Sequence, residues 1–226
     1  MKPIVLMTQT HTYEDARVRI RHLPFIKPVP LSFDERVLKS HYDWLIFTSK
    51  NAVNMFRPYL EHVHIKNIAG IGEKTKQYCD SIGLEVRFYP NDYSQEGFLK
   101  THPIQKEDVV LMPSSIKARP LLTDSLISQG IQVTKIDLYD IQVVQTSVNC
   151  AVQAMNENQI DAITFASSSA AHAFFKTAPP KRTHFYYAIG EQTARTIQQY
   201  GHTCIKADQQ TLESLITKII EERSKT

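Results

Sequence analysis

The sequence predicts an α/β protein built on parallel sheets, and three observations support this class. Apolar runs typical of strands buried on both faces alternate with segments of helical periodicity. A long stretch of this alternation recurs later in the chain at a constant offset. Polar clusters stand where the strands end and the helices begin. Strand alternating with helix indicates a parallel sheet with helices on both faces.

The first elements are a strand and an extended run. Residues 3–10, "PIVLMTQT", read as a strand that ends in polar side chains, and we expect a helix after it. An extended run follows at 25–33, "FIKPVPLSF". Pro28 and Pro30 remove two backbone donors from this run, so it fits an edge or connecting strand better than the centre of a sheet.

A longer unit of alternating strands and helices comes next. Gly72 is expected to open its second helix, and Gly83 to end that helix in the left-handed conformation. Ser94 is expected to cap the third helix. The strands are predicted at 44–48, 65–71 and 86–89, and the helices at 52–60, 73–82 and 95–100.

The remaining chain repeats this plan. Residues 108–115, "DVVLMPSS", predict a strand followed by a helical segment and an extended run at 136–144, "IDLYDIQVV". The long unit then recurs, ending in an amphipathic helix at 212–220 with Thr211 as its cap.

The recurrence holds one register over a long stretch. Ser49 matches Ser167, and "AGIGEKT" at 69–75 matches "YAIGEQT" at 187–193. Chance rarely preserves one offset in this way, so we interpret the chain as containing a duplicated unit.

Polar residues at the strand-to-helix junctions are candidates for ligand binding. Ligands of open parallel sheets lie outside the carboxyl ends of the strands, where helix N-termini offer unpaired N–H groups and a partial positive charge. Any one junction could instead be an ordinary helix cap, but several in two copies suggest a cleft for several anionic groups. The candidates are Thr48, Ser49, Lys50, Asn51, Gly72, Ser114, Ser115, Lys117, Ser167, Ser168, Ser169, Gly190, Gln192 and Thr193.

Composition narrows the class of protein. The net charge is +3 with scattered Lys and Arg, so no nucleic-acid partner is expected. Apolar runs are shorter than the roughly 18 to 20 residues of a membrane span, and the N-terminal run is too short for a signal peptide. We therefore expect no membrane association and a cytoplasmic location. The 3 cysteines form no CxxC or metal-binding spacing, so no metal is expected.

Five ordered segments together span nearly the whole chain: "YDWLIFTSKNAV", "VVLMPSSIKARPLLTDSL", "GIQVTKIDLYDI", "IDAITFASSSAAHAFF" and "YAIGEQTARTIQQYGH". In this order they resemble the uroporphyrinogen-III synthase family. Gln9 and Ser114 stand where members of that family often have arginine, whereas Arg119 matches a recurrent family arginine.

The resemblance implies a specific fold. Family members have two flavodoxin-like α/β domains with parallel sheets, joined by a two-stranded linker. The first domain is expected at 1–27 and 147–226, and the second at 35–137. The linker strands are expected at 28–34 and 138–146. The "TSKN" and "ASSS" loops are then expected to face one another across a cleft.

The resemblance also implies a reaction and its participants. The family enzyme is a cofactor-free lyase of porphyrin and haem biosynthesis. It dehydrates and cyclises hydroxymethylbilane, a linear tetrapyrrole, to uroporphyrinogen III, inverting ring D through a spiro intermediate. Tyr139 matches a family tyrosine and is the candidate proton donor, although it could instead pack the domain junction. A monomer with transient contact to the preceding pathway enzyme is expected.

Two other functions compete with this one. A two-domain protein could bind a small polyanionic ligand without turnover, because tandem α/β domains around a cleft also serve as ligand-binding modules. A glycosyl or phosphoryl transferase would need a phosphate loop or metal-binding carboxylates, and "GIGEKT" lacks the P-loop spacing.

Overall fold

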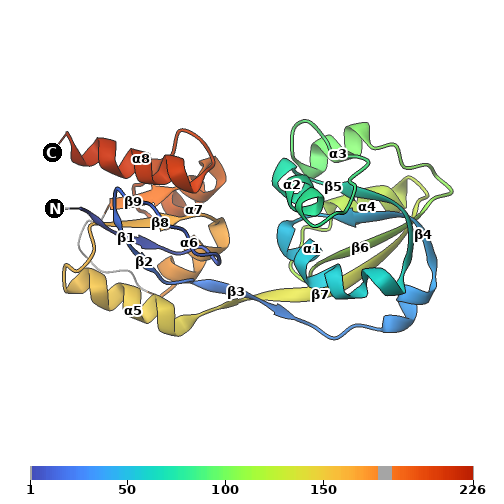
Figure 1. Cartoon of the computed structure of the whole chain (residues 1–226), viewed down its shortest axis with the longest axis horizontal. Coiled ribbons are helices and arrows are strands. Elements are labelled where there is room, and N and C mark those ends of the chain that lie inside the picture. Colours follow the sequence, from blue (N-terminus) through green and yellow to red (C-terminus); the bar gives the residue numbers. More distant parts are fainter. Residues whose placement is uncertain (1, 178–184, 226) are drawn as a thin grey trace. The chain divides into compact units, whose positions relative to one another are not determined.

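The chain forms two β-sheets of mainly parallel strands, one in each of two units (Figure 1). Unit 1 combines Met1–Lys27 with Gln142–Thr226, and unit 2 is Pro28–Ile141. The computed structural model describes residues 2–177 and 185–225. The α/β class predicted from the sequence is confirmed.

The sheet of unit 1 has the strand order β10-β9-β8-β1-β2, and its paired strands run parallel. The first strand therefore lies between the second and the third, which is the flavodoxin-like order. The strands are β1 (Ile4–Met7), β2 (Arg19–His22), β8 (Ala162–Phe165), β9 (Phe185–Ala188) and β10 (Ile205–Lys206).

Helices cover both faces of this sheet. Leu6 packs on the face covered by α5, α6 and α7, while Val5 and Met7 point to the opposite face and pack with α8. Figure 1 shows α5 and α8 on the two sides of the strands. The helices are α5 (Gln145–Asn156), α6 (Ser168–Phe175), α7 (Glu191–Gln199) and α8 (Leu212–Arg223).

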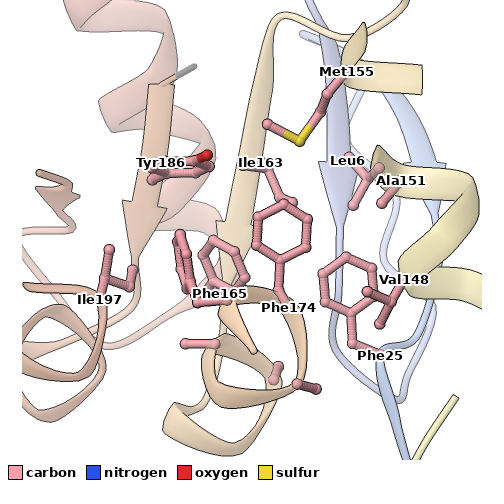
Figure 2. Packing of buried hydrophobic residues seen from close by; sticks show 14 of the residues in the cluster. Leu6, Phe25, Val148, Ala151, Met155, Ile163, Phe165, Phe174, Tyr186 and Ile197 are labelled. Atoms are coloured by element: carbon pink, nitrogen blue, oxygen red, sulfur yellow. The ribbon is translucent and has the colours of Figure 1, made fainter. Parts of the chain in front are cut away.

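Aromatic rings fill the core beneath α5, α6 and α7 (Figure 2). The Phe25 and Phe174 rings stack with centroids 5.5 Å apart and an interplanar angle of 4°. Phe165 packs against Phe174 at 5.6 Å and against Tyr186 at 6.1 Å. These large buried side chains hold α6 against the sheet. Strand β8 ends at Phe165, and α6 begins shortly after it at Ser168.

The sheet of unit 2 has the order β3-β7-β6-β4-β5. Strand β3 lies at its edge, as Pro28 and Pro30 predict. The pairs among β4, β5, β6 and β7 are parallel. The strands are β3 (Ile26–Pro30), β4 (His41–Phe47), β5 (His64–Gly70), β6 (Val109–Ser115) and β7 (Gln132–Val143).

The helices of unit 2 also divide between two faces. Leu45 and Phe47 pack with α1 and α2, whereas Trp44 and Ile46 pack with α3 and α4. The elements are η1 (Glu35–Lys39), α1 (Lys50–Phe56), η2 (Arg57–His62), α2 (Glu73–Ser81), α3 (Gln95–Thr101) and α4 (Leu121–Ser128).

The two sheets share one plan. When β4 is matched to β8 and β5 to β9, as the repeat requires, β6 takes the place of β1 and β7 the place of β2. The duplicated unit inferred from the sequence is therefore visible in the strand order.

Two local predictions were wrong. Residues 8–18, all of which are described, contain no helix, and Arg19–His22 forms strand β2 instead. Ile20 packs on the core while Arg19 is exposed, so the alternation is that of a strand. The strand expected at 86–89 is reduced to one bridge between Ala69 and Phe88, because Pro90 follows and lacks the N–H that a longer ladder needs.

Candidate functional site

A hydrogen bond joins two candidate residues at the carboxyl edge of the unit 2 sheet. Ser49 caps α1, and its Oγ accepts the Ala52 N–H at 3.2 Å. The same Oγ lies 3.0 Å from the hydroxyl oxygen of Tyr139 on β7. Ser49 is thus both the ordinary helix cap and a partner of the candidate proton donor.

A β-bulge sets the direction of the Tyr139 side chain. Along the β6–β7 pair, Ser114 lies opposite Asp137 but Ser115 lies opposite Tyr139, so Leu138 is an extra residue in β7. Leu138 and Tyr139 are consecutive, yet both pack in the same core cluster, which also contains Leu45 and Phe47. A bulge re-aims the side chains that follow it, and here it directs the Tyr139 phenol toward Ser49.

Burial controls the acidity of this phenol. Desolvation raises the pKa of Tyr139, and the hydrogen bond with Ser49 acts in the opposite direction. The phenol is therefore protonated at neutral pH and can act as a proton donor. A Ser49 hydroxyl that donates to the phenol oxygen would stabilise the phenolate left after proton transfer.

The loop after β6 is fastened to β7 beside Tyr139. The Ile116 N–H donates to the Tyr139 carbonyl at 2.9 Å, and the Lys117 N–H donates to Ser115 Oγ at 3.2 Å. Lys117 Nζ lies 2.8 Å from Asp140 Oδ1 and donates to the Ile141 carbonyl at 3.2 Å. The hydrogen bond from Lys117 holds the pKa of Asp140 below its usual range.

Gly72 leaves the N-terminus of α2 uncovered at this edge. Its φ of −137° is extended backbone that any residue adopts, and no side chain caps the helix there. A Cβ at this position would meet nothing within 4 Å. The fold itself therefore gives no reason for glycine here, whereas an anion approaching the helix N–H groups would need the space.

Other candidates of unit 2 differ in accessibility. Lys50 is exposed, with its Nζ 4.6 Å from the centroid of the Tyr78 ring, and Thr48 and Asn51 are half-buried. Ser114 is fully buried, and its hydroxyl donates to the Ser115 carbonyl at 3.4 Å. The structure therefore buries Ser114, because helices cover both faces of β6 and the buried run of this strand continues to this residue.

Unit 1 repeats part of this arrangement. Ser167 caps α6, and its Oγ accepts the Ala170 N–H at 3.2 Å, as Ser49 does in unit 2. Gly190 opens α7 in extended backbone, with Gln210 3.0 Å from where its Cβ would stand. Ser168 is half-buried and Ser169 exposed.

The first turn of α7 presents one of its two candidate side chains. Gln192 is exposed, whereas Thr193 is only 4% exposed and points into the core. The structure therefore leaves Gln192 available to a ligand and places Thr193 among the packed residues of unit 1.

Three polar residues at the carboxyl edges of the two sheets were not proposed as functional residues in the sequence analysis. His22 Nε2 lies 2.7 Å from the Gln9 carbonyl oxygen at the carboxyl edge of unit 1. The Oε1 atom of Gln9 is buried and has no hydrogen-bond partner within the described part of the chain. Asp140 of unit 2 could have been suspected, because it directly follows Tyr139 and is a carboxylate near Lys117.

The carboxyl edges of the two sheets present only a few kinds of chemical group. They offer hydroxyls, lysines and helix N-termini for anions, and the Tyr139 phenol as a candidate proton donor. Within residues 2–177 and 185–225, no group of at least 3 His, Cys, Asp or Glu side chains is placed to hold a metal ion. No helix among these residues is long and apolar enough to cross a membrane.

Comparisons of the sequence with known proteins agree on one family. A sequence model described as uroporphyrinogen-III synthase HemD matches residues 10–217. The porphyrin biosynthesis protein HemD of Ruminiclostridium josui is 22% identical over 214 residues, covering 88% of this chain but 42% of that protein. The uroporphyrinogen-III synthase of Synechococcus elongatus is 24% identical over 208 residues, covering 84% of this chain and 79% of that protein.

Solved structures agree on the fold. Uroporphyrinogen-III synthetase from Helicobacter pylori 26695 aligns with a TM-score of 0.69 at 20% identity, covering 99% of this chain and 100% of the other. A mutant uroporphyrinogen III synthase from Thermus thermophilus aligns with a TM-score of 0.67 at 15% identity and the same coverage. At these identities the likeness concerns the fold.

Proposed function

The chain belongs to the uroporphyrinogen-III synthase family, and from this we infer that it converts hydroxymethylbilane to uroporphyrinogen III. The single observation that carries this inference is the family match over residues 10–217. The match favours the synthase over a polyanion-binding protein without turnover. The enzyme is a cyclising lyase of haem biosynthesis that needs no cofactor.

The reaction needs one proton in and one proton out. Protonation of the hydroxymethyl group breaks its C–O bond and releases water, leaving an azafulvene cation. Ring D attacks through its substituted carbon to form a spiro intermediate. That intermediate fragments and closes again through the free α-carbon of ring D, which loses its hydrogen as a proton. The atoms balance as substrate giving product and water.

We assign the proton donation to Tyr139. Its phenol has an ordinary pKa of 10.0 that burial raises further, so it is protonated at neutral pH. The Ser49 hydroxyl 3.0 Å away is placed to donate to the phenol oxygen as negative charge develops there. A positioned general acid typically accelerates a step by about 10² to 10⁴-fold.

Binding of the substrate carboxylates falls to the remaining donors in this proposal. Ser115, Gly72 and Lys50 supply hydroxyl, N–H and ammonium donors in unit 2, whereas the single hydroxyl hydrogen of Ser49 is directed to Tyr139. Ser167, Ser168, Ser169, Gly190 and Gln192 supply the equivalent donors in unit 1. Charge-assisted hydrogen bonds to carboxylates are the stronger kind. The substrate cyclises readily unaided, so holding its reactive geometry is a large part of the catalysis.

The setting of the enzyme is also part of the proposal. It acts in the cytoplasm as a monomer and binds neither nucleic acid nor membranes. Because hydroxymethylbilane closes spontaneously, transient contact with the enzyme that makes it would shorten the exposure of this substrate to water.

One experiment tests the activity. The purified protein is supplied with hydroxymethylbilane, and the uroporphyrinogen isomers are resolved after oxidation. We expect the type III isomer in excess. Type I isomer alone, as spontaneous closure gives, would remove the synthase assignment.

A further inference from the structure

We propose that Lys117 and Asp140 form a positioning pair that holds the Tyr139 phenol in place for proton transfer. This rests on the proposed function, because it concerns the same reaction. It also gives Lys117 a different role from the substrate binding expected from its place in the sequence. Asp140 enters as a new functional residue.

The bulge at Leu138 is the place where β7 loses its pairing with β6. Up to Ser114, β6 and β7 pair in one regular register, and after the bulge only Ser115 and Tyr139 continue the pairing. A bulge disrupts the ladder locally and bends the strand. Tyr139 stays within β7, which runs on to Val143 beside β3, but its pairing with β6 ends just where the phenol needs a fixed position.

The loop after β6 replaces the lost pairing. The Ile116 N–H binds the Tyr139 carbonyl at 2.9 Å. One residue further on, Lys117 Nζ reaches both Asp140 Oδ1 at 2.8 Å and the Ile141 carbonyl at 3.2 Å. The loop thus binds three consecutive residues of β7, and Tyr139 is the first of them.

The local charges favour positioning over substrate binding. The ammonium of Lys117 already has an anionic partner in Asp140, whose side chain is 25% exposed and thus partly shielded from water. Two of the three N–H donors of Lys117 already bind Asp140 and the Ile141 carbonyl, so a substrate carboxylate would have to share the ammonium with the Asp140 carboxylate. Asp140 next to a polyanion would also repel it, unless Lys117 neutralises the charge.

A positioning role and a substrate-binding role for Lys117 predict different kinetic results for the Lys117→Met and Asp140→Asn variants. If the pair positions Tyr139, Asp140→Asn and Lys117→Met should both lower kcat by about three- to tenfold with little change in KM, because a displaced donor loses rate rather than binding. If Lys117 binds substrate, Lys117→Met should raise KM while Asp140→Asn frees the lysine and lowers KM.

A double variant tests whether Lys117 and Asp140 act together, and a neighbouring ion pair provides a control. The double variant Lys117→Met with Asp140→Asn should be no slower than either single variant, since both break one link. Lys117→Asp with Asp140→Lys should recover part of kcat.

Lys135 and Asp137 form an ion pair on the same strand, before the bulge, and serve as the control. Lys135→Met and Asp137→Asn should leave kcat and KM unchanged.

The product isomers give a second readout. A mispositioned donor slows the enzymatic closure, so we expect more type I isomer from the Lys117 and Asp140 variants than from the controls. An Asp140→Asn enzyme with unaltered kcat and unaltered isomer ratio would overturn the positioning role. If the unsubstituted protein yields type I isomer alone, the proposed function itself fails, which is a distinguishable result.

Discussion

Ser49 and Tyr139 share a hydrogen bond of 3.0 Å although 90 positions separate them in the chain. Ser49 belongs to a loop that the internal repeat duplicates, whereas Tyr139 lies on a strand next to a bulge. The contact joins an anion-binding type of loop to the one buried phenol proposed to act as an acid. It therefore defines the point at which proton transfer can be tested by single substitutions.

Replacing Tyr139 with Phe removes the proposed acid and its hydrogen bond with Ser49 but keeps the buried ring. We expect kcat to fall by about 10² to 10⁴-fold, the usual contribution of a positioned general acid. Turnover should persist, because a water molecule can supply the proton and the substrate is reactive. Initial rates and isomer ratios with hydroxymethylbilane measure this. A kcat within threefold or so of the unsubstituted enzyme would move the acid elsewhere.

Ser49 and Ser167 form a matched pair for separating capping from catalysis. Each caps its helix by accepting an N–H at 3.2 Å, but only Ser49 also contacts Tyr139. Both alanine variants should lose about 1 kcal/mol of folding stability from the cap. Ser49→Ala should also lower kcat, by about tenfold or less, whereas Ser167→Ala should change kcat less. Urea unfolding and kinetics on the two variants provide the comparison, and equal kcat values would contradict a role for the Ser49–Tyr139 contact.

Local signals in the sequence predicted the elements well. Gly83 has a φ of +81° where a left-handed helix end was expected, and Ser94 and Thr211 cap their helices through their side chains. These features depend on a few neighbouring residues, so the sequence contains the necessary information. Strand β2 (Arg19–His22) lies in the segment between 10 and 25, where the sequence analysis predicts a helix.

The contacts within the candidate site could not be predicted in the same way. The direction of Tyr139 depends on the extra residue Leu138 in β7, and a bulge of this kind has no local sequence signature here. Likewise, Ser114 looks like its neighbour Ser115 in the sequence, yet one is fully buried and the other is half-exposed. Register between distant strands decides both outcomes.

Gly72 allows a test of anion binding at a helix N-terminus. Because its backbone is extended and a Cβ would meet nothing within 4 Å, Gly72→Val should fold normally. The added side chain would cover the first N–H groups of α2, so we expect kcat/KM to fall more than the roughly tenfold limit for losing one hydroxyl. Steady-state kinetics and thermal unfolding measure the two effects.

Gly83 is the matched control for Gly72. Its φ of +81° disfavours any other residue, so Gly83→Ala should lower the free energy of unfolding by about 1 kcal/mol. The kcat/KM of the folded Gly83→Ala enzyme should be unchanged. If Gly72→Val kept full activity, carboxylates would not approach this helix end.

Tyr186 provides the last prediction, which concerns stability and pH. Its hydroxyl is buried in the aromatic core (Figure 2) and has no hydrogen-bond partner among the described residues. Burial raises the pKa of Tyr186 from 10.0 to about 12. The unfolded chain therefore loses this proton first as pH rises, and the contribution of Tyr186 to the free energy of unfolding falls between pH 10 and about 12 and is constant well below pH 10.

Tyr186→Phe removes both the unpaired hydroxyl and this titration. We expect the variant to be as stable as the original or more stable at neutral pH, because an unsatisfied buried group costs about 1 to 3 kcal/mol. Its stability should also decline less between pH 10 and 12. Tyr42→Phe is the control: the Tyr42 hydroxyl donates to the Val37 carbonyl at 2.8 Å, so its loss should destabilise by about 1 kcal/mol. Urea unfolding at pH values on both sides of 10 measures both variants. A Tyr186→Phe protein destabilised as much as Tyr42→Phe would mean that the Tyr186 hydroxyl has a partner in solution.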